Sequence, residues 1–300
     1  MTDVAGAGGP VRIDRSGTRV QRVLLLTHRA PEATSGALSS VLGIIEEQGA
    51  QIVVPPTEVL KHDRLGQYQV ESGLTLRKDG TDLILVLGGD GSMLRALARE
   101  AGSGAPVMGV NFGRVGFLCS IERDDLENGL RRALAGDYMV IGLPSLTVDW
   151  SDGQVNAVND LALVRGGESR IADLSFAIDG VRVSNVRCDG AVVSTPVGST
   201  AYNLAAGGPT VSWRVRCYVL SFLAGHHLDT RPMIISPEES LVLTNSAIWG
   251  SCDLLADGVK VGALAPGRQV VVGLQGAEVR LGIFAENAFF QRYREKFGRG

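Results

Sequence analysis

Residues 83–94 read L-I-L-V-L-G-G-D-G-S-M-L, so a short apolar run leads directly into a glycine-rich turn. The apolar run fits a buried strand, and residues 93–100 fit a helix. Gly88, Gly89 and Gly91 allow backbone N–H groups to come close to an anion, because no Cβ stands in the way. The start of a helix adds further unpaired N–H groups. The stretch therefore predicts a strand, a phosphate-binding loop and a helix.

Asp90 stands among these donors. A carboxylate repels phosphate, so it is unexpected in a loop that only holds phosphate. It suits a site where a hydroxyl group loses its proton while it attacks phosphorus. The alternative is a tight turn in which Asp90 caps the following helix.

The first half of the chain alternates strand-like and helix-like segments. The strand-like segments are 22–27, 51–54, 82–87 and 107–111, and the helix-like segments are 38–48, 93–100 and 124–135. Such alternation predicts a parallel sheet covered by helices, in which ligands bind beyond the carboxyl ends of the strands. The polar stretch 58–76 is predicted to be irregular.

After Gly136 the pattern changes to short β-rich runs separated by turn residues. These runs are 145–150, 155–164, 172–178, 181–187, 191–195, 218–223, 240–244 and 270–274. The Asp-Gly pairs at 152–153, 179–180 and 257–258 are turn signals. This half predicts a mostly antiparallel β domain, from 137 to 278, after an α/β domain from 21 to 136. Residues 1–20 are predicted to be a disordered tail.

Composition fits a soluble protein of about two domains. The 300 residues are 45% hydrophobic and 20% charged, with a net charge of −3. No global basic field favours nucleic acid or an anionic membrane, so neither is expected as a partner. The uncharged stretch 190–213 is too rich in Gly, Ser, Thr and Pro for a membrane span, and it suits the lining of a pocket.

The cysteines are widely spaced, without a C-x-x-C pair, at Cys119, Cys188, Cys217 and Cys252. This spacing argues against a zinc site and a disulfide framework, and it predicts a cytoplasmic protein. Near the end of the chain, aromatic residues recur at near-helical spacing within 287–297. They predict an amphipathic closing segment that packs on the body of the protein.

Three further stretches carry chemistry. Residues 111–118 read N-F-G-R-V-G-F-L, Asn159-Asp160 follows a strand-like run, and 189–202 read D-G-A-V-V-S-T-P-V-G-S-T-A-Y. Together with G-G-D-G, these stretches resemble the NAD kinases. The resemblance is to the bacterial ATP/polyphosphate-dependent type, and within it to the actinobacterial members. G-G-D-G alone is shared with lipid kinases and phosphofructokinases, whereas T-P-x-G-S-T-A-Y is far more specific.

The resemblance implies a Rossmann-like α/β N-terminal domain and a β-sandwich-like, dinucleotide-binding C-terminal domain. It also implies that residues 279–300 return to the first domain and that the protein is a homodimer or homotetramer. The implied reaction transfers a phosphoryl group from ATP, another nucleoside triphosphate or polyphosphate to the adenosine ribose 2′-hydroxyl of NAD, giving NADP. Mg²⁺ would be carried by the donor phosphates, and no dedicated metal site is visible in the sequence.

The resemblance assigns the catalytic base to Asp90 and phosphate or dinucleotide contacts to a larger set. That set is Gly88, Gly89, Gly91, Arg95, Phe117, Asn159, Asp160, Arg170, Arg187, Asp189, Thr200, Ala201, Tyr202, Asn203 and Ala205. Taken alone, several have simpler interpretations. Arg95 could be a solvent-exposed helix residue, Asn159 a cap or turn residue, Asp189 the start of an Asp-Gly turn, and Tyr202 a core residue.

The chain departs from the usual family pattern at several positions. Ser92 replaces Thr but keeps the hydroxyl, and Asp160 replaces Glu with a shorter reach. Val197 stands where Thr or Ser is usual, so a hydroxyl directed to the nicotinamide side is lost, at a cost of about 0.5–1.5 kcal/mol. The stretch 213–227 differs more, which affects pocket shape, the choice between NAD and NADH, and subunit contacts.

Two other functions stay open at this point. A diacylglycerol or sphingoid kinase would share G-G-D-G and the two-domain plan, but it gives no reason for T-P-x-G-S-T-A-Y. A dinucleotide-binding regulator that has lost catalysis would account for Val197 and the altered stretch 213–227, but not for the intact G-G-D-G.

Overall fold

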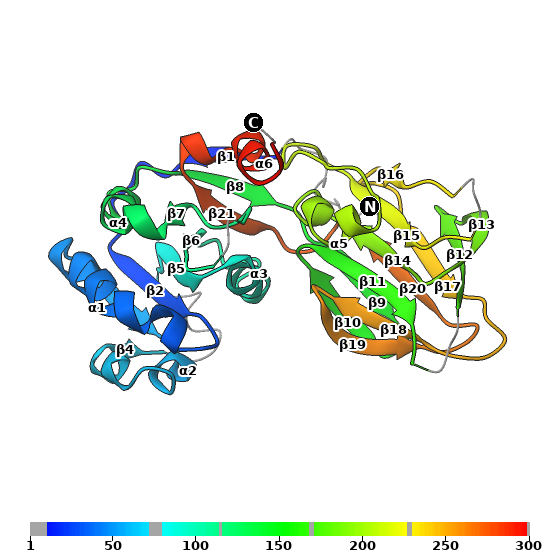
Figure 1. The fold of residues 1–300 in the computed structure, drawn as a ribbon, viewed down its shortest axis with the longest axis horizontal. Helices are drawn as coiled ribbons and strands as arrows, with labels where there is room; N and C mark the ends of the chain where they lie inside the picture. Colours follow the sequence, from blue (N-terminus) through cyan, green and yellow to red (C-terminus); the bar gives the residue numbers. More distant parts are fainter. Residues whose placement is uncertain (1–10, 72–79, 114–115, 168–170, 227–229, 299–300) are drawn as a thin grey trace, which may run out of the picture. The chain divides into compact units, whose positions relative to one another are not determined.

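The computed structural model describes residues 11–71, 80–113, 116–167, 171–226 and 230–298. The chain forms two compact units (Figure 1). Arg12–Gly142, together with the chain from Val279 onward, forms the α/β unit, and Leu143–Glu278 forms the β-rich unit. The first unit extends beyond the expected boundary at residue 136 because β8 (Met139–Leu143) belongs to its sheet.

The α/β unit is built on one sheet whose central strands are parallel. Its order is β1 (Ile13–Arg15), β8, β21 (Val279–Ile283), β6 (Val107–Asn111), β5 (Leu83–Gly88), β2 (Arg22–Thr27), β3 (Gln51–Val54) and β4 (Gln69–Val70), with β7 (Ile121–Glu122) beside β6. The strands from β21 to β4 pair in parallel, and β1 pairs with β8 in antiparallel fashion. The expected helix-covered parallel sheet is confirmed.

Helices cover both faces of this sheet (Figure 1). α1 (Glu32–Glu47) and α4 (Leu126–Leu134) share a hydrophobic core with the side chains of one face, including Leu85 of β5. α3 (Asp90–Arg99) packs on the other face, where a Cβ at Gly109 of β6 would lie 2.6 Å from Met93 Sδ. The shorter helical segments are α2 (Pro56–Val59), η1 (Asp63–Gln67), η3 (Arg123–Asp125) and η5 (Ala285–Asn287).

Two expectations for this unit were wrong in part. Residues 13–15 form β1 rather than a disordered tail, because they pair with β8 and because the Ser16 N–H donates to the backbone oxygen of Tyr138. Residues 1–10 lie outside the described residues. The stretch 58–76 contains η1 and β4, and Glu58 is buried, where it accepts hydrogen bonds from the N–H and hydroxyl of Thr27. A buried, paired carboxylate leaves no apolar pattern in the sequence.

The β-rich unit consists, within the described residues, of two six-stranded antiparallel sheets. One has the order β10 (Gly153–Ala157), β9 (Leu146–Trp150), β20 (Gln269–Gly273), β17 (Leu241–Asn245), β12 (Ala172–Ile178) and β13 (Val181–Cys188). The other has the order β16 (Met233–Ile235), β15 (Tyr218–Leu223), β14 (Gly190–Ser194), β11 (Asp160–Arg165), β18 (Cys252–Ala256) and β19 (Val259–Leu264). Apolar side chains from both sheets, such as Leu243 and Leu161, form one core, which confirms the sandwich-like fold.

The predicted strand 155–164 is two strands, broken at Val158 and Asn159. Their N–H groups donate to the Asp257 carboxylate instead of continuing a ladder. After β14 the chain forms η4 (Gly198–Thr200) and α5 (Tyr202–Ala205).

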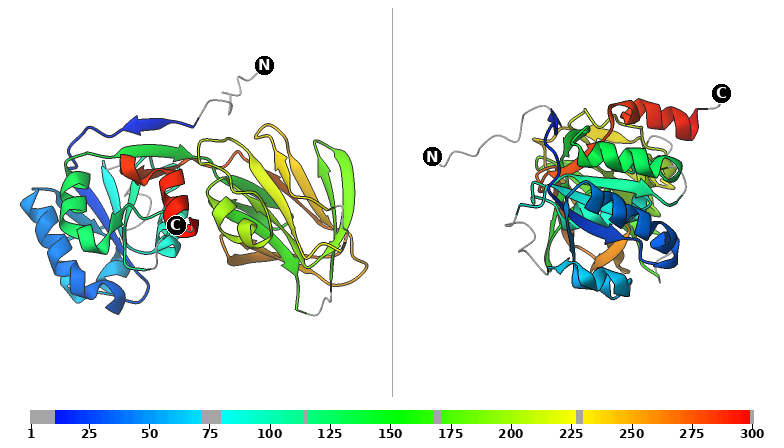
Figure 2. Two further views of the ribbon diagram at one scale, coloured as in Figure 1. Left: turned by 45° about the horizontal axis from the view of Figure 1, so that its top comes forward. Right: turned by 90° about the vertical axis from the view of Figure 1, so that its left-hand side faces the viewer.

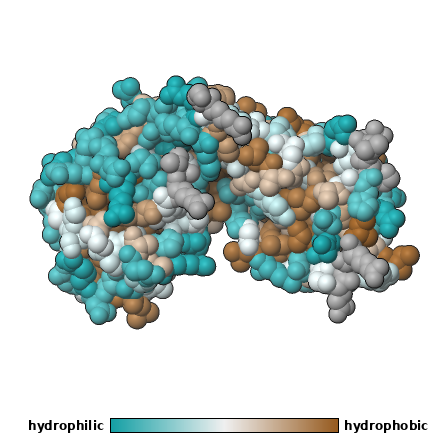
Figure 3. Space-filling view, viewed as in Figure 1, coloured by the Kyte–Doolittle hydropathy of each residue, from teal (hydrophilic) through white to brown (hydrophobic). Residues whose placement is uncertain are grey.

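The C-terminal segment forms β21 and α6 (Phe289–Phe297), and both belong to the α/β unit, as the red ribbon shows in Figure 2. None of the described helices is long and apolar enough to cross a lipid bilayer. The surface of the β-rich unit exposes several hydrophobic side chains (Figure 3), among them Ile234, Ile248 and Trp249.

Candidate active site

The glycine-rich loop joins β5 directly to α3. Every residue of β5 is buried, and α3 begins at Asp90, earlier than the sequence pattern indicated. A Cβ at Gly88 would lie 2.5 Å from Ser92 Oγ, so packing within the protein requires this glycine. At Gly89 and Gly91 the nearest atoms would lie 3.9 and 3.8 Å away. Neither of these two glycines has a positive φ, so the protein's own packing and backbone do not demand them. Their bare backbone leaves room for a ligand.

Asp90 is held by a neighbouring loop. Its Oδ2 accepts a hydrogen bond from the Phe117 N–H at 2.7 Å, and its Oδ1 accepts one from the Leu118 N–H at 3.0 Å. A Cβ at Gly116 would lie 2.2 Å from Asp90 Oδ1, so this loop can approach only because residue 116 is glycine. Among the described residues no side chain caps α3. The capping role is therefore wrong, and the carboxylate is fixed in one orientation with acceptor capacity to spare.

Cationic side chains lie beside the loop. Arg95 is solvent-exposed, and its Nη2 donates to Ser92 Oγ at 3.0 Å. Partial burial lowers the pKa of Arg95, and repulsion by the Arg29 guanidinium adds to this effect. Arg29 follows β2, whose Thr27 pairs with Leu87 of β5. Sequence reasoning missed Arg29, although adjacent parallel strands end at the same edge of a sheet.

In the β-rich unit, the Asn159-Asp160 pair and the T-P-V-G-S-T stretch are tied together. The Thr195 N–H donates to the Asn159 backbone oxygen at 2.9 Å, and the Thr195 hydroxyl donates to the Val158 oxygen at 2.7 Å. A Cβ at Gly198 would lie 2.1 Å from the Asn159 oxygen. Segments that are far apart in the sequence thus form one corner of the unit, the candidate binding corner, made of residues 158–160 and 195–202.

Asp257 organises this corner from a third segment. Its carboxylate accepts hydrogen bonds from the N–H groups of Val158, Asn159 and Asp160 at 2.9, 2.7 and 3.2 Å. Asp257 itself has φ +50°, in the Asp257-Gly258 turn. The Asp-Gly pair indicates this turn in the sequence, but no sequence pattern indicates the contact of Asp257 with residues 158–160.

Two side chains of the corner have unusual environments. Burial, and then the negative charge of Asp257, raise the pKa of Asp160 to about 7. Asp160 can therefore either donate or accept a hydrogen bond near neutral pH. Asn159 Oδ1 is buried and finds no donor among the described residues. An unpartnered buried acceptor suits a hydroxyl group of a ligand.

The residues after Thr195 divide into exposed and internal positions. Ala201, Tyr202 and Ala205 are exposed, and the Thr200 hydroxyl donates to the Val197 oxygen at 3.4 Å. Asn203 is fully buried, with its Nδ2 donating to the backbone oxygens of Ser199 and Pro209 and its Oδ1 accepting from Ser221. Its side chain supports the loop. The Val197 side chain is only 3% exposed.

Arg187 and Asp189 are not brought to this corner. Arg187 lies in β13 of the other sheet, opposite Asp173 of β12. In the β11–β14 pair, Asp160 lies opposite Ser194 and Val164 lies opposite Gly190. Asp189 is therefore at the far end of β14, about 17 Å from Ser194 at the rise of an extended strand. Asp189 Oδ1 lies 3.0 Å from Arg165 Nε, in an ion pair. Arg170 lies outside the described residues.

Phe117 contributes to the site through its backbone N–H group, since its side chain is only 3% exposed.

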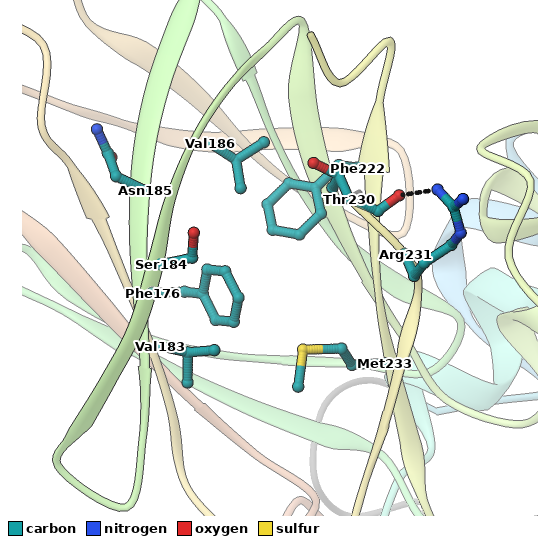
Figure 4. Close-up of a pocket in the computed structure, with 9 residues that line it drawn as sticks. All are labelled: Phe176, Val183, Ser184, Asn185, Val186, Phe222, Thr230, Arg231 and Met233. Carbon is teal, nitrogen blue, oxygen red and sulfur yellow. Dashed lines mark hydrogen bonds between the residues drawn. The ribbon is translucent and has the colours of Figure 1, made fainter. Parts of the chain in front are cut away.

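A separate pocket of about 440 Å³ opens in the β-rich unit, where Phe176, Phe222 and Met233 face one another (Figure 4). None of the predicted site residues that the structure describes lines this pocket.

A glycine loop with a tethered carboxylate is the arrangement expected of a kinase that phosphorylates a hydroxyl group. Residues 30–138 match the ATP-NAD kinase N-terminal domain, and residues 158–273 match the ATP-NAD kinase C-terminal domain. The chain is 34% identical to an NAD kinase of Corynebacterium diphtheriae over 84% of this chain and 83% of that protein. It is 33% identical to NAD kinase 2 of Streptomyces coelicolor over 93% and 95%.

Two solved structures share the fold. Yeast NADH kinase in complex with NADH superposes with a TM-score of 0.82 at 21% identity, covering 94% of this chain and 89% of that one. An NAD kinase from Archaeoglobus fulgidus in complex with ATP gives 0.70 at 24% identity, covering 92% and 97%. The chain belongs to the NAD kinase family. Neither the lipid kinase nor the non-catalytic regulator finds support in these comparisons.

Proposed function

We propose that the protein transfers the γ-phosphoryl group of ATP to the 2′-hydroxyl of the adenosine ribose of NAD, giving NADP and ADP. The observation that carries this proposal is the Asp90 carboxylate, fixed by two backbone N–H groups beside glycines that leave their backbone open. Family membership supports ATP as donor and NAD as acceptor.

In this mechanism the donor phosphates bind the backbone of Gly89 and Gly91 and the start of α3. The donor phosphates would carry Mg²⁺, which is commonly held largely by phosphates and waters and would neutralise part of their charge. Among the described residues no group of three or more His, Cys, Asp or Glu side chains is placed to hold a metal ion. Arg95 and Arg29 supply positive charge beside the loop.

Asp90 orients the acceptor hydroxyl and takes its proton as the new bond forms. The 2′-oxygen attacks the γ-phosphorus, the bond from this phosphorus to the β,γ-bridging oxygen breaks, and ADP leaves with the bond electrons. A positioned base of this kind contributes about 10²–10⁴-fold to the rate. Most of the remaining acceleration comes from positioning and charge stabilisation.

The binding corner of the β-rich unit serves the dinucleotide. Asn159 offers an unpartnered acceptor, Asp160 offers a carboxyl group poised between two protonation states, and the exposed Thr200–Tyr202 backbone and the Tyr202 ring offer a surface. Asp189 precedes the far end of β14, and Arg187 lies in β13 of the other sheet, so neither joins this corner within the same unit.

The active form is proposed to be a homodimer or homotetramer in the cytoplasm. The β-rich unit exposes Val181, Ile234, Ile248 and Trp249, which self-association would cover. The four free, buried cysteines fit a reducing compartment. Light scattering coupled to size-exclusion chromatography measures the oligomeric state.

The proposal is tested by incubating the purified protein with NAD, ATP and Mg²⁺ and measuring NADP with an NADP-specific dehydrogenase. Asp90→Asn is expected to lower turnover by about 10²–10⁴-fold while NAD affinity stays within a few-fold. NADP formation that persists at the wild-type rate in this variant would show that Asp90 is not the base.

A further inference from the structure

The C-terminal helix α6 packs on the loop that holds Asp90. The ring centroid of Phe117 lies 6.0 Å from that of Phe289 and 5.8 Å from that of Phe297. The Lys296 ammonium lies 4.9 Å from the centroid of the Phe117 ring. The residue whose N–H orients the Asp90 carboxylate is therefore fixed by side chains that come from the end of the chain.

A second set of contacts fixes the same loop three residues later. Arg292 of α6 is 4% exposed, and its Nη2 donates to Ser120 Oγ at 3.3 Å, while its Nε donates to the Asn287 backbone oxygen at 2.9 Å. Asn287 Nδ2 in turn donates to the Ser120 backbone oxygen at 2.7 Å. The Ser120 hydroxyl donates to the Gly282 oxygen of β21 at 3.0 Å. Ser120 is thus held on three sides by the C-terminal segment.

The charge of Arg292 is unusual in this position. Among the described residues its guanidinium forms no ion pair within 4.0 Å, although the side chain is buried. Burying an unpaired charge is costly, so packing alone does not explain an arginine here. Its burial lowers the pKa of Arg292, and the groups whose negative forms oppose this effect are Cys119, Asp90 on α3, Glu122 on β7 and Glu295 on α6.

Of these groups, Asp90 is the one with a catalytic assignment. Burial raises the pKa of Cys119, so its thiol is neutral and contributes no charge near neutral pH. Glu122 Oε2 already accepts a hydrogen bond from Asn111 Nδ2 at 3.0 Å. The buried guanidinium therefore lies within electrostatic reach of a carboxylate that needs its negative charge to accept a proton.

We propose that Arg292 is a positioning residue for Asp90, because it holds the loop of residues 116–120 in place through Ser120. This inference rests on the proposed function, in which Asp90 accepts the proton of the hydroxyl group. It gives Arg292 of α6 a role in catalysis that acts only through Ser120 and the loop. A misplacement of about 1 Å at a reacting group can lower a rate by about 10²-fold.

The test compares Arg292→Met, Arg292→Lys and the control Arg294→Met in the full-length protein. Arg294 lies two residues further along α6 and is exposed, so the control makes the same substitution on the same helix. We expect Arg292→Met to lower kcat by about 10²-fold with the KM values for NAD and ATP within a few-fold. Arg292→Lys keeps a donor and a positive charge, and it is expected to recover about tenfold of that loss. Arg294→Met is expected to match the wild type.

Circular dichroism and thermal melting establish that each variant is folded. If Arg292→Met does not fold, Phe297→Ala replaces it, because it removes a half-exposed ring from Phe117 and is expected to lower kcat about tenfold with unchanged KM values. Equal losses in the Met and Lys variants, or losses carried by KM rather than kcat, would overturn the positioning role.

Asp90→Asn is assayed in parallel to separate the two proposals. If Asp90→Asn keeps its turnover, the assignment of the base fails and the role of Arg292 fails with it. If Asp90→Asn loses turnover while folded Arg292→Met keeps it, only the role of Arg292 is refuted.

Discussion

Gly116→Ala tests the link between the 116–118 loop and the Asp90 carboxylate. The added Cβ would lie 2.2 Å from Asp90 Oδ1, and real Cβ atoms essentially never come closer than 3.0 Å. The carboxylate oxygen or the loop must therefore move by at least 0.8 Å, the difference between these two distances. Such a movement disturbs both N–H hydrogen bonds, from Phe117 and Leu118.

The expected result is a fall in kcat of about 10²-fold, because a base displaced by about 1 Å no longer meets the hydroxyl group. The KM for NAD is expected to change little, and overpacking is expected to lower the free energy of unfolding by about 1–3 kcal/mol. Steady-state NADP formation and urea denaturation measure these effects.

The matched control is Gly36→Ala, in α1, where a Cβ would meet nothing within 4 Å. This control is expected to keep wild-type kinetics and to gain about 0.5–1 kcal/mol of stability, since alanine favours a helix over glycine. A folded Gly116→Ala variant with wild-type kcat would refute the proposed dependence of catalysis on the Asp90 carboxylate that this loop holds.

Three further predictions concern both binding regions. Gly89→Ala is expected to fold normally, because the atom nearest to the added Cβ would lie 3.9 Å away. It is expected to raise the KM for ATP in steady-state assays, since the methyl group fills the space left for phosphate. An unchanged KM would mean that phosphate binds elsewhere. Arg29→Met is expected to raise the KM for ATP more than the KM for NAD, and the reverse order would place Arg29 at the acceptor. Asp160→Asn tests the pH dependence of stability. Because the pKa of Asp160 is raised to about 7 in the folded protein, the protonated carboxyl group stabilises the folded state at acid pH. This contribution to the free energy of unfolding is lost as the pH rises toward and through 7. The melting temperature of Asp160→Asn relative to the wild type is therefore expected to rise between pH 5 and pH 8, and a constant difference would contradict the raised pKa.

The sequence was sufficient to predict the strand, loop and helix around Asp90. A fully apolar run followed by glycines has few other solutions, and β5 and α3 are found where this pattern places them, with α3 starting three residues earlier. The aromatic spacing near the end of the chain likewise predicted the helix that the structure shows as α6. Local periodicity was enough in these cases.

Contacts between backbone atoms and distant side chains could not be predicted. Phe117 was selected for a ligand contact, but its N–H group orients Asp90, and no sequence pattern marks a donor 27 residues away. Asp257 was recognised only as a turn residue, although its carboxylate holds residues 158–160. β1 was missed because a three-residue run with a single apolar residue, Ile13, gives no strand pattern, and this strand is defined by its pairing with β8.

Cys119 lies directly behind the glycine loop, with its Sγ 3.5 Å from the Gly88 backbone oxygen. The thiol is buried, and burial raises its pKa, so it holds almost no thiolate, the form that reacts with alkylating agents and peroxide. Electrophiles added to the folded protein should therefore spare this sulfur. Its slow labelling would then report how often the α/β unit opens, which makes Cys119 a built-in probe of local unfolding.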